Sequence, residues 1–126
     1  MKYLLRAVAV LAIALTFAAA AQAAETKAVQ TMARILMNLN HFPNDADKKA
    51  LQDVLKDPAT TKDEATVAQA LLNVQHKVGD TDKPKLQAIV DNKTAPESLK
   101  TIATIILKLE HTPTADEKAK LKTIAT

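Results

Sequence analysis

The three histidines of this chain recur at a constant spacing of 35 residues. They are His41, His76 and His111, and each follows an apolar helical pattern by a few residues. Imidazole is the commonest side-chain ligand for zinc and suits copper equally well. Three histidines at equivalent places in one small chain therefore make a three-histidine metal site one hypothesis for its function.

The spacing also gives a reason to prefer a structural role. The chain contains no His-x-x-x-His and no Glu-x-x-His pair that would place two ligands on one helix face. Packed helices stand about 8–10 Å apart, whereas nitrogen ligands of one zinc ion must lie within about 3.5 Å of each other. A straight stack of helix pairs would therefore keep the histidines apart. Only a ring closure with all three on its axis would bring them together.

Two structural roles would explain why the histidines recur. A histidine at the C-terminal end of a helix donates to the last free carbonyl groups and is favoured by the helix dipole. It would also reach the acidic residue six positions further on, which is Asp47, Asp82 or Glu117. We prefer this structural interpretation of His41, His76 and His111 to metal binding.

The elements that carry the histidines form an internal repeat. The segments 32–57, 67–92 and 102–126 align without gaps, and an exact spacing over many columns is the mark of a repeat protein. The columns that are identical in all three copies are Ala33/Ala68/Ala103, His41/His76/His111, Lys48/Lys83/Lys118 and Leu51/Leu86/Leu121. We place the copies at about 24–59, 60–94 and 95–126.

Each copy predicts two helices. In the first copy Val29, Met32, Leu36 and Leu39 recur at helical spacing, and a breaker such as Pro43 follows. The second helix of each copy is shorter. Capping boxes, in which a threonine precedes a glutamate by three residues, are predicted at Thr61/Glu64, Thr94/Glu97 and Thr114/Glu117. The fold class is therefore all-α, with three helix-turn-helix repeats forming a short solenoid or a compact bundle.

The first 23 residues have the pattern of a secretory signal peptide. Lys2 and Arg6 are followed by an apolar run and then by Ala21-Gln22-Ala23, a small-residue cleavage site. We therefore expect a single domain over 24–126 that is periplasmic or secreted and leaves the membrane after cleavage. The leader holds two of the 17 basic residues, so 15 basic side chains face 14 acidic ones, a net charge of +1. Such a balance does not favour nucleic-acid binding.

No set of residues predicts catalysis. The chain has no Cys, one Ser and no glycine-rich phosphate loop, so the nucleophiles and phosphate cradles of the common enzyme classes are absent. We expect a non-catalytic binding or structural module, with a protein partner or self-association and no cofactor. The lysine column Lys48, Lys83 and Lys118 is a candidate interaction surface. A periplasmic metal- or haem-binding protein that uses the three histidines is the alternative.

Overall fold

The computed structural model describes residues 25–126, so the predicted signal peptide and its cleavage site lie outside the described part. Within this range the chain is all-helical, with six helices and no β-strand. The helices are α2 (Lys27–Met37), α3 (Asp45–Lys56), α4 (Lys62–Leu72), α5 (Lys83–Asp91), α6 (Glu97–Lys108) and α7 (Ala115–Ala125). None of these six is long and apolar enough to span a membrane.

Side-chain caps begin four of the helices. The predicted capping boxes Thr61/Glu64 and Thr114/Glu117 are both formed, at the starts of α4 and α7. At α2 and α3 the side chains of Thr26 and Asn44 accept a backbone N–H of the first turn. Each such bond satisfies an N–H that has no partner inside the helix.

The capping box predicted at Thr94 and Glu97 is wrong. Helix α6 has Pro96 at its N-cap and no side-chain cap. Thr94 instead bonds to the side chain of Asn92, through both its N–H and its hydroxyl. Thr94 is therefore hydrogen-bonded within the turn that precedes Pro96 and does not cap the helix.

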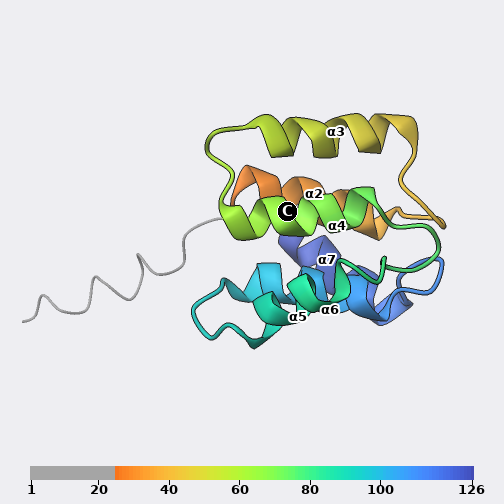
Figure 1. The fold of residues 1–126 in the computed structure, drawn as a ribbon. Coiled ribbons are helices and arrows are strands. Elements are labelled where there is room, and N and C mark those ends of the chain that lie inside the picture. Colours follow the sequence, from red (N-terminus) through yellow and green to blue (C-terminus); the bar gives the residue numbers. More distant parts are fainter. Residues whose placement is uncertain (1–24) are drawn as a thin grey trace, which may run out of the picture.

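The helices form a closed bundle. Helices α2, α4 and α6 contact one another, α3 packs against α4, α5 against α6, and α7 returns to pack against α2. Figure 1 shows the three inner helices with the other three around them, and the loops after α2, α4 and α6 at one end of the bundle. Because the first and last helices meet, the arrangement is the compact bundle and differs from an open solenoid, whose ends stay apart.

The interior is built from the apolar columns of the sequence. Ala33, Ala68 and Ala103 are each 0% exposed, as are Leu51, Leu86 and Leu121. The alanines lie on the inner helices, where a small side chain lets the helices approach closely, and the leucines reach inward from the outer helices. One buried cluster therefore connects all six helices.

The inner helices end earlier than their apolar spacing predicts. Helix α2 ends at Met37 and α4 at Leu72, yet Leu39 and Val74 remain buried beyond these ends. Leu39 and Val74 lie two residues past the ends of their helices, and their side chains still pack in the core. The apolar pattern in the sequence therefore extends further than the helix does. Consequently the histidines do not lie at helix ends, as predicted, but three or four residues further on in the loops.

Candidate metal centre

The three histidine loops meet at one end of the bundle and bond to one another through their backbones. The N–H of His41 donates to the carbonyl of His111 (2.7 Å), that of His76 to the carbonyl of His41 (2.6 Å), and that of His111 to the carbonyl of His76 (2.8 Å). These bonds form a closed cycle of three residues that are 35 or 70 positions apart in the sequence. The cycle holds the three Cα atoms around a common axis.

The backbone of each histidine adopts an unusual conformation. The φ angles of His41, His76 and His111 are 73°, 69° and 72°, and they are the non-glycine residues with positive φ in the described part. At His41 the N–H of Phe42 also donates to the carbonyl of Asn40 over 2.8 Å. A turn of this kind is rare and strained, and positive φ costs a non-glycine residue about 1–3 kcal/mol. A glycine would avoid this cost at all three positions.

The imidazole rings converge on one point through the same nitrogen. The Nδ1 atoms of His41 and His76 are 3.0 Å apart, those of His41 and His111 3.0 Å, and those of His76 and His111 2.9 Å. The ring centroids are 4.8–4.9 Å apart. Because the centroids are further apart than the nitrogens, each ring extends outward from the axis and its Nδ1 faces the centre.

Three nitrogens at this spacing form a ligand set for one cation. A neutral imidazole that presents a lone pair at Nδ1 carries its proton on Nε2, which here is on the outer side of each ring. Three lone pairs that face each other repel unless a positive charge lies between them. With metal–nitrogen bonds of about 2.0–2.1 Å, a tetrahedral ion requires nitrogens about 3.3–3.4 Å apart. Each ring would need to withdraw by only about 0.2 Å.

The structure supplies the ring closure that sequence reasoning gave as the one route to such a cluster. His41, His76 and His111 are the group of at least three potential ligand residues found between residues 25 and 126. His41 is half-buried, whereas His76 and His111 are exposed. The expected separation of about 8–10 Å between the histidines applies to a straight stack of helix pairs. Because α7 returns to pack against α2, the helices close on one another and this expectation does not hold.

The predicted pairing of the histidines with acidic residues is wrong. No ion pair of the described residues includes a histidine. Asp82 instead accepts from the side-chain amide of Asn73 over 3.2 Å, and Glu117 accepts from the N–H of Thr114 over 2.9 Å. Asp82 is bonded in a loop contact at the start of α5 and Glu117 in the cap at the start of α7, so neither carboxylate is paired with a histidine.

The predicted interaction lysines lie at the same end as the histidines. Lys48, Lys83 and Lys118 are exposed and stand within the first four residues of α3, α5 and α7, the helices that follow the histidine loops. The Nζ of Lys83 pairs with Asp80 at 3.3 Å, and that of Lys48 lies 6.0 Å from the centre of the Phe42 ring. The three lysines therefore lie on three different helices, each near the helix start that follows a histidine loop.

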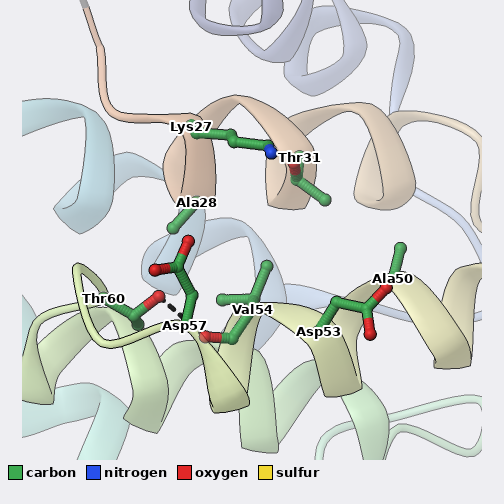
Figure 2. Close-up of a pocket in the computed structure, with 8 residues that line it drawn as sticks. All are labelled: Lys27, Ala28, Thr31, Ala50, Asp53, Val54, Asp57 and Thr60. Atoms are coloured by element: carbon green, nitrogen blue, oxygen red, sulfur yellow. Dashed lines mark hydrogen bonds between the residues drawn. The ribbon is translucent and has the colours of Figure 1, made fainter.

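Hollows elsewhere on the bundle lack a comparable ligand set. One cavity of about 190 Å³ lies between α2 and α3. Figure 2 shows its lining, with Lys27 and Thr31 on the α2 side, Asp53 and Asp57 on the other, and the Thr60 hydroxyl bonded to the Val54 carbonyl. Its two carboxylates are not accompanied by a histidine or a third carboxylate, so this groove offers no multidentate site.

The sequence contained one further signal for the histidine centre. Asn40, Gln75 and Glu110 precede the histidines, and a breaker follows each of them, so every histidine stands in a short turn and not in a helix.

Comparisons of the chain with protein-family models, with curated proteins and with solved structures found no match. The histidine centre therefore has to be interpreted from its own geometry.

Proposed function

We propose that this protein is an exported, non-catalytic binding protein whose ligand is a single transition-metal ion held by His41, His76 and His111. The observation that carries the proposal is the mutual distance of 2.9–3.0 Å between the three Nδ1 atoms. Hydrogen bonds cannot satisfy all three contacts at once, because an Nδ1 that donates a proton has no lone pair left to accept one. The proposal replaces the structural interpretation preferred from the sequence with its metal-binding alternative.

The ligand set favours zinc or another borderline first-row ion. Imidazole nitrogens suit Zn²⁺, Cu²⁺, Ni²⁺ and Fe²⁺, whereas Mg²⁺ and Ca²⁺ require oxygen ligands. Three convergent nitrogens without a thiolate match the three-histidine zinc geometry. Haem, the other part of the alternative, fits poorly. A haem iron takes axial ligands on opposite faces of the porphyrin, and three nitrogens 3 Å apart on one side would collide with the ring.

The backbone conformation supports the same proposal. Positive φ at a residue other than glycine costs free energy, and such strain concentrates at functional sites. Here the chain bears this cost three times at the positions that supply the converging nitrogens. We interpret the three loops as copies of one module, in which the strained turn directs the imidazole towards the axis.

A bound ion would also connect parts of the chain that are distant in sequence. The three ligands belong to the loops after α2, α4 and α6, and the contact between α7 and α2 that closes the bundle has no covalent link. An ion that binds the folded chain alone stabilises it by mass action, by about 2.7 kcal/mol at a hundredfold excess over Kd. We therefore expect metal to raise the unfolding temperature.

Calorimetric titration of the tag-free protein with Zn²⁺ tests the proposal. We expect one ion per chain and an increase in melting temperature, with the same result for Cu²⁺, Ni²⁺ and Co²⁺ at different affinities. The matched control is His76→Asn, because asparagine tolerates positive φ but removes the ring. Loss of one of three ligands should weaken binding at least tenfold. A variant that binds Zn²⁺ as tightly as the native chain would refute the proposal.

A further inference from the structure

We infer that a metal ion at this centre keeps one coordination position open to solvent and takes a small monodentate anion there. The inference rests on the proposed metal binding and goes beyond it by naming the class of the fourth ligand. Three observations carry it: the direction of the rings, the exposure of the histidines and the charges around them.

The nitrogen spacing would place an ion on the axis but to one side of the plane of the three nitrogens, because nitrogens 3.0 Å apart lie about 1.7 Å from that axis and a metal–nitrogen bond is about 2.0–2.1 Å long. The centroids of His41 and His76 are 4.8 Å apart and their Nδ1 atoms 3.0 Å apart, so the lone pairs point almost directly at the axis. The imidazoles of His41, His76 and His111 would then hold the ion from one side. Its remaining position then lies along the axis, which gives a four-coordinate site with one open position.

Solvent reaches this position. His76 and His111 are exposed, and the cycle of backbone hydrogen bonds involves the same residues. The exposure of these two residues shows that solvent reaches the triad, while the backbone cycle ties the three residues together. A hollow of about 310 Å³, lined in part by Phe42, Lys48 and His76, gives additional access beside the triad.

The charges favour an anion as the fourth ligand. Three neutral imidazoles leave the full double charge of a divalent ion, and no histidine of residues 25–126 has a carboxylate partner that would offset it. Lys48 lines the adjoining hollow and adds a positive charge. Hydroxide, formed when a bound water releases its proton to solvent, or an added anion such as azide would lower this charge.

Cobalt substitution tests the inference. Co²⁺ reports its coordination number, because four-coordinate complexes absorb visible light strongly and six-coordinate complexes weakly. The tag-free chain is loaded with one equivalent of Co²⁺ and titrated with sodium azide. We expect intense visible bands that shift along a single saturable curve. In Lys48→Gln we expect the same spectrum and azide affinity reduced about two- to fivefold.

The possible failures are distinguishable. Intense bands that azide does not change would overturn the open position but leave metal binding intact. Weak bands of a six-coordinate ion would also overturn the inference, because more than one position would then be open. If the chain binds neither Co²⁺ nor Zn²⁺, while circular dichroism shows it folded, the proposed function itself fails.

Discussion

Replacing His76 by glycine tests whether this residue is a metal ligand or holds the loops together through its ring contacts. The φ of His76 is 69° and the residue is exposed. Relief of the positive φ should contribute about 1–3 kcal/mol to stability, and the greater chain entropy of glycine should cost about 0.5–1 kcal/mol. The net expectation in the presence of a chelator is a gain of about 0–2.5 kcal/mol. For a domain of this size, 1 kcal/mol corresponds to about 4–8 °C in melting temperature.

Added metal should reverse the order of stability. The native chain gains about 2.7 kcal/mol at a hundredfold excess of metal over its Kd, whereas His76→Gly lacks one ligand and gains far less. Thermal unfolding followed by circular dichroism, with chelator and then with Zn²⁺, measures both states. His76→Asn is the control, because asparagine accepts positive φ without the entropy of glycine.

If the His76 ring instead holds the loops together, the loss of its ring contacts should oppose the gain from relief of the positive φ in the absence of metal. The His76 ring makes edge-to-face contacts with the rings of His41 and His111, at centroid distances of 4.8 and 4.9 Å. If these contacts hold the loops together, their loss should cost about 0.5–1.5 kcal/mol for each pair. A His76→Gly variant that is less stable than the native chain by more than about 1 kcal/mol in chelator would refute our reasoning.

Three further predictions concern the centre and the bundle around it. Zn²⁺ affinity should fall as the pH is lowered, because a protonated imidazole does not coordinate and up to about three protons compete with the ion. Calorimetric titration at several pH values would measure this fall in affinity. A constant affinity would exclude histidine ligands. Ala68→Leu, at a position with no exposed surface, should destabilise the bundle by about 1–3 kcal/mol in urea unfolding, and a neutral result would mean that the inner helices are not closely packed. Thr61→Ala should lower stability by about 1 kcal/mol, because it removes a capping box. Thr94 caps no helix, so Thr94→Ala should change stability by less than about 0.5 kcal/mol. Equal losses in the two variants would contradict the assigned caps.

Local signals in the sequence were sufficient to predict that the described part contains six helices, but not where each helix ends or that α3, with 12 residues, is longer than α2, with 11. Helical spacing located the apolar faces, and the pairs Thr61/Glu64 and Thr114/Glu117 located two helix starts, because a cap involves residues only three positions apart. The error at Thr94 is of the same local kind. Asn92 lies two positions before it and competes for the same side chain and N–H. Short-range hydrogen bonds of this type are decided by the order of a few residues.

The histidine centre could not be predicted in the same way, because it depends on how the helices close. The distance between His41 and His111 is set by whether α7 returns to α2, and the alanines of the inner helices are compatible with a stack as well as a ring. The sequence periodicity is identical in both cases. The loop conformation was equally hidden, since the buried Leu39 continued the helical stripe beyond the true end of α2.

Closure of the bundle and convergence of the histidines depend on each other. The hydrogen bond from the N–H of His41 to the carbonyl of His111 joins the first loop to the last, at the one junction of the ring that has no covalent link. The other two bonds of the cycle join loops that the chain already connects. An ion bound by all three imidazoles would therefore act most strongly at the α2–α7 junction, where its loss would let the ring open. We accordingly expect metal to slow amide exchange in α7 and α2 more than in α4 and α5.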